Sequence, residues 1–461
     1  MSQATWTLCY PLCVWNLTAS RCLPCEDDAS AISCSTNGKS HQDLSSTRAL
    51  VQTRVPMNIA IIGAGAAGLA AAKNLGTCHT ITVFEALPSL AGVWASHASA
   101  PCQPIYEELR TNIPIDLMAF WDFPFDANDK RASTGDFPEA KAVRAYLARY
   151  ADHFKLAPLI QFDRRVVSVE KVSDGWQVQF DNNEISCFDA VVVCTGHYHQ
   201  PFFPAVPGLE DFHGRATHSA NFVTGVDHRE ETVVIWGGHA SGTDLVRLIA
   251  PHAKRVFWSG HAPTMADATS DLPNVQCCSD IERFEDERVV LTDGKTVTGI
   301  DRVIFCTGYQ YDFPFLSKSL LHHDGFQLTQ LYRDLLHVDH PTLAFVGIPS
   351  LIIPFPLFDI QSRWLNALWS GNLIAPSSED QRTWLLARDQ AFAQTALPPR
   401  AFHRLGERQM HYLTDLLSEA GGPPMPDWFA SAAKAAQSHR LRYASDYRDQ
   451  PFNPSAYPPP S

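Results

Sequence analysis

Two glycine-rich loops, each placed between a predicted β-strand and a predicted helix, constrain the fold of this chain more than any other feature. The first loop follows the apolar strand 59–62 and reads Gly-Ala-Gly-Ala-Ala-Gly over residues 63–68. The second follows strand 233–236 and reads Gly-Gly-His-Ala-Ser-Gly over residues 237–242. A strand that enters such a loop and a helix that leaves it are typical of a dinucleotide-binding βαβ unit. The sequence therefore predicts an α/β protein with two Rossmann-like domains.

The first loop carries every feature of a phosphate-binding turn. Gly63 allows the tight turn, Gly65 lets the backbone approach a pyrophosphate, and Gly68 lets the helix pack against the strand. The N-terminus of that helix offers unpaired N–H groups and a partial positive charge to phosphates. A second predicted strand, 80–84, ends at Glu85, whose carboxylate can accept hydrogen bonds from the ribose hydroxyls of an adenosine. These residues predict one bound dinucleotide.

The second loop is less regular, because His239 stands where the middle glycine is expected. A side chain at this position narrows the space above a pyrophosphate. The candidate cofactor-binding residues of this loop are Gly237, Gly238, Ser241 and Gly242. Together, the two loops predict a protein that holds two dinucleotides and passes electrons between them.

Size and charge are those of a globular enzyme with more than one domain. The chain has 461 residues, of which 45% are hydrophobic and 18% are charged, so it can bury a sizeable core. The formal net charge of -13 argues against nucleic acid as a partner. The best candidate for a membrane span, residues 343–358, contains three prolines and is too short. We therefore expect a cytoplasmic protein without a transmembrane anchor.

The chain divides into five predicted segments. Residues 1–56 show no lasting periodic pattern, so we expect them to be a disordered extension or a mis-assigned start, with a targeting segment as the alternative. Similar strand-and-turn patterns at 190–196 and 303–309, one on each side of the second loop, are expected to mark crossings between two domains. After the extension, we predict a first dinucleotide domain in two parts, 57–197 and 331–450, of which the second ends in helices. The second domain, 198–330, is inserted between these two parts. Residues 451–461 are predicted to be a tail.

A segment between the two loops resembles a fingerprint of the flavin-containing monooxygenases. Residues 212–222 read Phe-His-Gly-Arg-Ala-Thr-His-Ser-Ala-Asn-Phe and match the family pattern FxGxxxHxxx(Y/F). The place of this match, after the first loop and just before the second, makes it specific. The resemblance covers roughly residues 57–415 and is nearest to the short fungal members. Further motifs similar to those of the family are Gly92-Val93-Trp94, Leu109-Arg110-Thr111-Asn112 and Thr307-Gly308-Tyr309.

The resemblance implies FAD on the first loop and NADPH on the second. Family members, of the N,N-dimethylaniline monooxygenase type, reduce FAD by hydride transfer and react it with O2 to form a C4a-hydroperoxyflavin. This species oxygenates a soft nucleophile, nitrogen or sulfur, of a small molecule. Because the cofactors carry the chemistry, few acid or base residues and no metal are needed.

The resemblance also implies roles for individual residues. It places Asn112, the candidate catalytic residue, near the flavin and the nicotinamide. It makes Gly92 and Trp94 further FAD-binding residues, and it makes Gln361 a contact of the flavin's pyrimidine edge. It gives His218 a structural role near the domain junction.

One departure from the family pattern concerns the choice between NADPH and NADH. The strand predicted at 255–258 is followed by Ser-Gly-His, with no arginine at its end. An arginine or lysine there would normally hold the 2′-phosphate of NADPH. Lys254, Arg255 and His261 are near in sequence, so NADPH is predicted from the resemblance more than from these residues.

Other functions stay open on the sequence alone. A Baeyer–Villiger monooxygenase is disfavoured, because Phe222-Val223 stands where that group carries a tryptophan followed by Pro or Asp. A disulfide reductase is disfavoured too, since Cys78 and Cys102 are too far apart to form its redox pair. A flavin-binding NAD(P)H oxidase or sensor without a dedicated substrate is not separated from a monooxygenase. The physiological substrate and a homodimeric state are open as well.

Overall fold

The computed structural model describes residues 55–95, 102, 104–106, 108–126, 135–260, 265–286 and 288–453. All of these residues belong to one unit, Gln52–Ser461. Three parts of the chain named above lie outside the described residues: the predicted extension up to residue 54, the residue His261, and the predicted tail from residue 454 onward.

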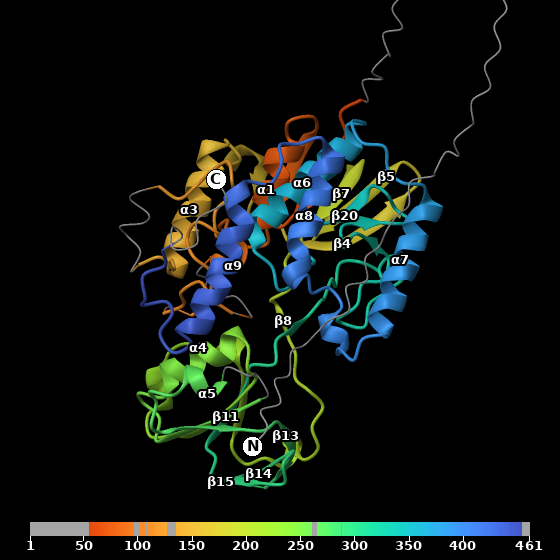
Figure 1. Cartoon of the computed structure of the whole chain (residues 1–461). Helices are drawn as coiled ribbons and strands as arrows, with labels where there is room; N and C mark the ends of the chain where they lie inside the picture. Colours follow the sequence, from red (N-terminus) through yellow and green to blue (C-terminus); the bar gives the residue numbers. More distant parts are fainter. Residues whose placement is uncertain are drawn as a thin grey trace, which may run out of the picture. The chain divides into compact units, whose positions relative to one another are not determined.

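A seven-stranded sheet carries the first domain (Figure 1). The strand order is β18-β19-β20-β7-β1-β2-β3, and the strands from β20 to β3 run parallel. Its central strands β1 and β7 are almost wholly buried, which requires a covering layer on each face of the sheet. The bounds are β1 Asn58–Ile62, β2 Thr80–Phe84, β3 Ile160–Gln161, β7 Ala190–Val193, β18 Leu331–Tyr332, β19 Leu336–His337 and β20 Leu343–Phe345.

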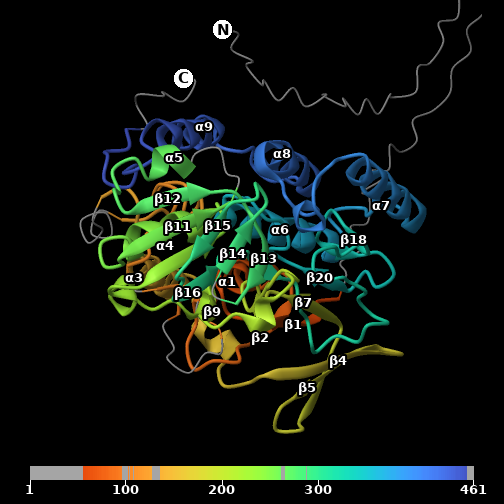
Figure 2. The same ribbon diagram turned by 90° about the horizontal axis from the view of Figure 1, so that it is seen from below.

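Helices cover one face of this sheet and a small antiparallel sheet covers the other. Side chains of β1 such as Ile59 and Ile61 pack against the helices, whereas Ala60 and Ile62 face the second layer. Figure 2 shows this order, with α8, α6 and α1 above β1 and β7, and with β4 and β5 below them. The bounds are α1 Ala66–Leu75, α3 Ala140–His153, α6 Pro354–Trp369, α8 Gln409–Ala420, β4 Val166–Val172, β5 Gly175–Phe180 and β6 Ile185–Phe188.

The second domain repeats this plan with five parallel strands in the order β12-β11-β10-β16-β9. The helices α4 and α5 pack on one face and the antiparallel sheet β13-β14-β15 on the other (Figure 1). The bounds are β9 Arg215–His218, β10 Thr232–Trp236, β11 Arg255–Ser259, β12 Val275–Cys278, β13 Ile281–Glu285, β14 Arg288–Leu291, β15 Thr296–Thr298, β16 Arg302–Phe305, α4 Ala240–Ile249 and α5 Met265–Ala268.

The chain crosses between the two domains twice, and the two crossings pair with each other. The strand β8, Gln200–Pro201, leaves the first domain and pairs antiparallel with β17, Tyr309–Gln310, which returns to it. The return comes earlier than the predicted boundary at residue 330. The reason is packing: Tyr311, Phe313 and Leu320 are buried against the strands of the first sheet.

The C-terminal part is helical, as predicted, but its end is not a free tail. After α7, Ser378–Ala393, and α9, Asp427–Arg442, the chain returns to the start of α3. Phe452 is buried against Phe137, and its backbone N–H donates to Asp136 at 2.7 Å. Residues 451–453, which the sequence analysis assigned to the tail, are therefore part of the folded domain.

The predicted fold class, two Rossmann-like dinucleotide-binding domains with the second inserted into the first, is confirmed. In the part of the chain that the structure describes, no helix is both long and apolar enough to span a bilayer.

Candidate functional site

One large cavity, of about 3250 Å³, lies at the carboxyl ends of the parallel strands of both sheets. In parallel α/β sheets this edge is where ligands bind. The cavity wall includes the loops after β1, β2, β7 and β20 of the first domain and the loops after β10, β11 and β16 of the second. Both glycine-rich loops therefore open on one space, as a pair of dinucleotides would require.

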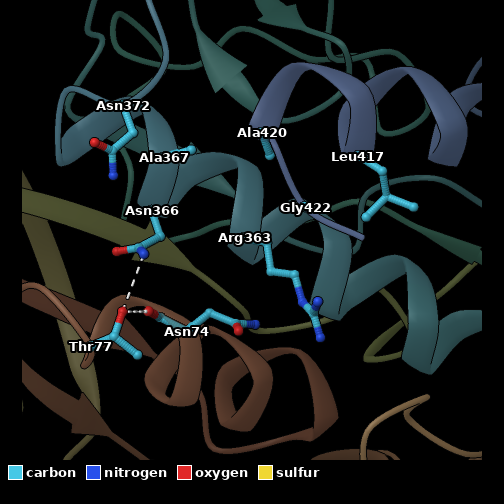
Figure 3. A pocket seen from close by; sticks show the side chains of 9 residues that line it. All are labelled: Asn74, Thr77, Arg363, Asn366, Ala367, Asn372, Leu417, Ala420 and Gly422. Carbon is cyan, nitrogen blue, oxygen red and sulfur yellow. Dashed lines mark hydrogen bonds between the residues drawn. The ribbon is translucent and has the colours of Figure 1, made fainter. Parts of the chain in front are cut away.

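A separate cavity of about 220 Å³ lies at the C-terminal end of α1, against α6 and α8 (Figure 3). Asn366 donates to Thr77 at 3.2 Å on its wall, and the Thr77 hydroxyl donates to the carbonyl of Asn74 at 2.7 Å. Neither glycine-rich loop contributes to this cavity, so the large cavity is the candidate functional site.

The three glycines of the first loop have different reasons to be glycine. A Cβ on Gly63, where φ is +103°, would lie 2.7 Å from the carbonyl oxygen of Cys194. A Cβ on Gly68 would lie 1.9 Å from the carbonyl oxygen of Gly63. Both glycines are thus demanded by the fold itself. A Cβ on Gly65 would meet only the Cα of Gly92, at 3.5 Å, which is ordinary contact. Gly65 lines the cavity, so its missing side chain leaves room for a ligand.

Glu85, Gly92 and Trp94 lie beside this loop on the cavity wall. The Glu85 carboxylate is buried and accepts hydrogen bonds from the backbone N–H groups of Ala64, at 2.8 Å, and Leu87, at 2.9 Å. These bonds fix the carboxylate at the end of β2, and its oxygens have further lone pairs for a ribose. Trp94 is half-buried and forms part of the wall with Gly92.

The second loop repeats the geometry of the first. A Cβ on Gly237, where φ is +133°, would lie 2.3 Å from the carbonyl oxygen of Cys306, and one on Gly242 would lie 1.8 Å from that of Gly237. Gly238 and Ser241 line the cavity. His239 is exposed, also lines the cavity, and is the N-cap residue of α4. The fold therefore keeps the two glycines that it needs and accepts a side chain at the middle position.

Asn112 lies on the loop that leads into α3. The backbone of this loop is fixed, because the Thr111 N–H donates to the Pro138 carbonyl at 2.9 Å and the Thr111 hydroxyl donates to that of Ile113 at 2.8 Å. Asn112 itself is exposed and lines the cavity. The structure thus brings Asn112 to the same cavity as both loops.

Comparison with known proteins agrees with this geometry. The flavin-binding monooxygenase-like family matches residues 56–266 and 269–427. The chain belongs to this family. It is 36% identical over 434 residues to the Arabidopsis thaliana flavin-containing monooxygenase FMO GS-OX5, with 87% of this chain and 93% of the relative covered. The solved structure of S-allyl-L-cysteine S-oxygenase from Allium sativum is 30% identical, with a TM-score of 0.81 and coverage of 88% of this chain and 97% of that one.

Flavin-binding monooxygenases of this family use FAD and NADPH, and the first loop of this chain fits FAD. Nearness to the fungal members stays a prediction, since the relatives named here come from plants.

The fit is supported by polar atoms that the sequence analysis did not single out. Thr195 and His197 follow β7 and line the cavity beside Gly63. Within the described part of the chain, the buried Thr195 hydroxyl has no hydrogen-bond partner. The buried ring nitrogens of His197 also meet no partner at hydrogen-bond geometry, although the Gly347 backbone is near enough to act on the ring. Burial, with smaller contributions from His403 and His199, lowers the pKa of His197 to about 4, so the ring is neutral at neutral pH. Buried unpartnered groups of this kind suit a polar ligand.

Their signal in the sequence was their position at and just after the end of the predicted strand-and-turn pattern 190–196. The carboxyl end of a parallel strand beside a phosphate-binding loop is where cofactor contacts are expected.

The fingerprint histidine has the structural role that the resemblance implied. His218 accepts a hydrogen bond from the Ala220 N–H at 3.1 Å on Nδ1 and donates from Nε2 to the Gly308 carbonyl at 3.0 Å. Burial lowers its pKa to about 4. His218 thus holds the residue that precedes β17, at the second crossing between the domains.

Gln361 departs from its predicted role. Its side chain is fully buried in α6 and does not line the cavity. Its Oε1 accepts from the Gly347 N–H at 2.9 Å, and its Nε2 donates to the Tyr412 hydroxyl at 2.7 Å. Both ends are used within the protein, so Gln361 acts on the site only through Gly347, which does line the cavity.

The two basic residues near the second loop in sequence lie at the wrong end of β11 for a phosphate clamp. Arg255 begins β11, whereas Gly260, just after its carboxyl end, lines the cavity. The Arg255 guanidinium donates to Gln276 at 2.7 Å and lies 4.5 Å from the ring centre of Phe257. Lys254 directly precedes Arg255, so it lies at the same, amino-terminal end of β11.

Substitutions at Gly65 and Gly68 can distinguish a glycine that ligand binding requires from one that folding requires. We expect Gly65→Ala to fold, because its Cβ meets no backbone closer than 3.5 Å. We expect its FAD affinity to fall at least about tenfold, equivalent to about 1.4 kcal/mol. Gly68→Ala should fail to fold, because its Cβ would lie 1.9 Å from a carbonyl oxygen. Circular dichroism and flavin absorbance of both variants measure these effects. A folded Gly65→Ala protein with unchanged FAD affinity would contradict this account of the first loop.

Proposed function

We propose that this protein is an NADPH-dependent monooxygenase that transfers one oxygen atom from O2 to the sulfur or nitrogen of a small molecule. The observation that carries the proposal is the single cavity on which both dinucleotide loops and Asn112 open. When bound, FAD supplies the redox chemistry, taking a hydride from NADPH and activating O2. The protein's own residues bind the two cofactors, orient the reacting groups and shield them from water.

The first task of these residues is to place the two cofactors. Gly65 and the N-terminus of α1 would receive the pyrophosphate of FAD, and Glu85 would receive its ribose; all three line the cavity. Gly238, Ser241 and the N-terminus of α4 would receive the pyrophosphate of NADPH. Basic side chains on the cavity wall favour these anions; among them are Arg144, Arg165, Arg404, Lys434 and Arg440.

The second task is to keep the reacting groups in a neutral, largely apolar surrounding. Ile113, Leu117, Met118 and Phe222 contribute apolar surface to the wall. His197 is neutral, and burial raises the pKa of Tyr309 well above its usual range. Such apolar surface and neutral polar groups suit attack by a soft nucleophile that needs only placement. Asn112 is the polar group proposed to orient the nicotinamide and the activated oxygen.

Sulfur is the favoured acceptor. The garlic relative, 30% identical over nearly its whole length, is an S-oxygenase of a thioether amino acid. Insertion of oxygen beside a ketone needs a cationic group to hold a deprotonated peroxide, and Arg110 is the cationic residue next to Asn112 in the sequence. The guanidinium of Arg110 binds the Asp449 carboxylate at 2.6 Å and also the backbone carbonyl of Arg448. This arrangement supports heteroatom oxidation over Baeyer–Villiger chemistry.

Three features of the proposal come from the family and the sequence and stay predictions: the preference for NADPH over NADH, a cytoplasmic location and a homodimer. The first is measured by the ratio of kcat/KM for the two nucleotides.

The proposed reaction is tested by offering a thioether, a tertiary amine and a cyclic ketone separately to the FAD-loaded protein with NADPH. We expect a sulfoxide from the thioether in the largest yield and no lactone from the ketone, because a heteroatom lone pair needs only placement. Product analysis by mass spectrometry measures the outcome. A lactone with the other two compounds untouched would contradict the proposal. Peroxide as the sole product with all three would favour an oxidase or sensor.

Asn112 is tested by Asn112→Ala, with Asn372→Ala as the matched control. Asn372 is an exposed asparagine on the wall of the small cavity in Figure 3, away from both loops. We expect Asn112→Ala to keep its FAD and to lose product formation by about 10²–10³-fold, the usual effect of one hydrogen-bonding group against a reacting oxygen. NADPH consumption, peroxide and product are measured together. Full product yield per NADPH in Asn112→Ala would exclude this role.

A further inference from the structure

A single buried arginine connects the loop of Asn112 to the helix that follows the second glycine-rich loop. Arg448 lies in the segment after α9, and its Nη1 and Nη2 donate to the two carboxylate oxygens of Asp244 at 2.7 and 3.1 Å. Its Nε donates to the backbone carbonyl of Thr111 at 3.0 Å. Thr111 directly precedes Asn112, and Asp244 lies in α4. One guanidinium thus contacts both dinucleotide domains.

Neighbouring groups hold this connection in one geometry. The Tyr106 hydroxyl donates to Asp244 Oδ2 at 2.6 Å, so the carboxylate has three donors. Arg110 donates to the Arg448 carbonyl from the other side. Burial raises the pKa of Tyr106, and Asp244 raises it further, so the phenol stays a neutral donor. Burial acts to lower the pKa of Arg448, but the Asp244 carboxylate outweighs it and the net pKa is raised. The Arg448 guanidinium is therefore positively charged at neutral pH.

The connection lies on the wall of the large cavity. Tyr106, Asn112, Asp244 and Arg448 all line it, together with the second glycine-rich loop. The side chains of Arg448 and Asp244 are only 16% and 11% exposed, so water screens their attraction weakly. The ion pair is thus placed between the phosphate-binding end of the NADPH site and the side chain proposed to meet the nicotinamide.

The folding of the C-terminal segment does not depend on this arginine alone. Tyr447 and Phe452 pack against Phe137 in a small apolar cluster on the start of α3. This cluster fastens the segment to the first domain by apolar contacts. The C-terminal segment is therefore anchored without the ion pair between Arg448 and Asp244 of α4, which indicates that this ion pair has another role.

We propose that Arg448 is a positioning residue: with Asp244 it fixes Asn112 relative to the NADPH-binding loop, so that both ends of the nucleotide meet a preformed site. This inference rests on the proposed function, because it assumes that the nucleotide spans from the second loop to Asn112. An arginine is required, since its planar fork binds a carboxylate with two N–H groups and a carbonyl with a third, which a lysine cannot do in the same geometry.

The test compares Arg448→Lys, Asp244→Asn and the double variant with Arg388→Lys as a matched control. Arg388 also donates to a carboxylate, that of Asp334 at 3.0 Å, and to the carbonyls of Leu331 and Thr329 at 3.1 Å. The two side chains of that pair are 13% and 11% exposed, and neither lines the large cavity. The control therefore removes a similar ion pair that has no contact with the site.

Two quantities are measured on FAD-loaded protein: the dissociation constant of NADP+ by calorimetry, and the product formed per NADPH with a thioether. We expect each single variant to raise the dissociation constant about tenfold and to lower product formation by up to about 10²-fold, the usual effect of a misplacement of about 1 Å. The double variant should resemble either single one, because both remove the same connection. Arg388→Lys should lower the melting temperature without changing either quantity.

The positioning role would be overturned if Arg448→Lys and Asp244→Asn kept the NADP+ affinity and the product yield of the wild type. It would also be overturned if these two quantities changed no more than they do in Arg388→Lys. If Arg448→Lys does not fold, Asp244→Asn, which keeps the shape of the side chain, decides alone. A wild-type protein that binds NADP+ but yields no oxygenated product contradicts the proposed function, and the NADP+ affinities of the variants then still decide the positioning role.

Discussion

Four close approaches of the backbone at glycine, two in each domain, govern the geometry of the whole site. In the first domain the turn at Gly63 lies against the carbonyl of Cys194, and Gly68 of α1 lies against the turn. In the second domain Gly237 and Gly242 make the same contacts with Cys306 and with the turn itself. Only glycine fits at these four positions. The contacts bring a helix N-terminus to the carboxyl edge of each sheet, and both edges face one cavity.

The electrostatics of the cavity follow from this construction. Two groups at the strand ends that line the cavity are held neutral at neutral pH: burial lowers the pKa of His197 to about 4 and raises that of Cys306 to about 12. Basic side chains on the wall, such as Arg144, Arg165 and Arg404, suit phosphates. A protein of this kind supplies placement and exclusion of water, and its cofactors supply reactivity.

Much of this could be predicted from the sequence, because the strand–loop–helix pattern fixes local geometry. The turn at Gly63 and the close packing at Gly68 were predicted from spacing, and the structure shows the close contacts there and at the corresponding Gly237 and Gly242. Contacts between distant segments could not be predicted in that way. Gln361 stands in a helix near the site, but nothing in the sequence shows that Gly347 and Tyr412 use both ends of its side chain. The joining of Arg448 to Asp244 and Thr111 depends in the same way on tertiary packing.

We propose that electrons pass from NADPH to FAD and then to O2, and that one oxygen atom reaches a soft nucleophile. To test this, the FAD-loaded protein is reduced with NADPH in the absence of oxygen, and ¹⁸O2 is then added together with a thioether. We expect the flavin absorbance to be lost on reduction and to return with oxygen, and the sulfoxide to carry one ¹⁸O atom. A flavin that NADPH does not reduce, or reoxidation that yields only hydrogen peroxide and no labelled sulfoxide, would contradict this proposal.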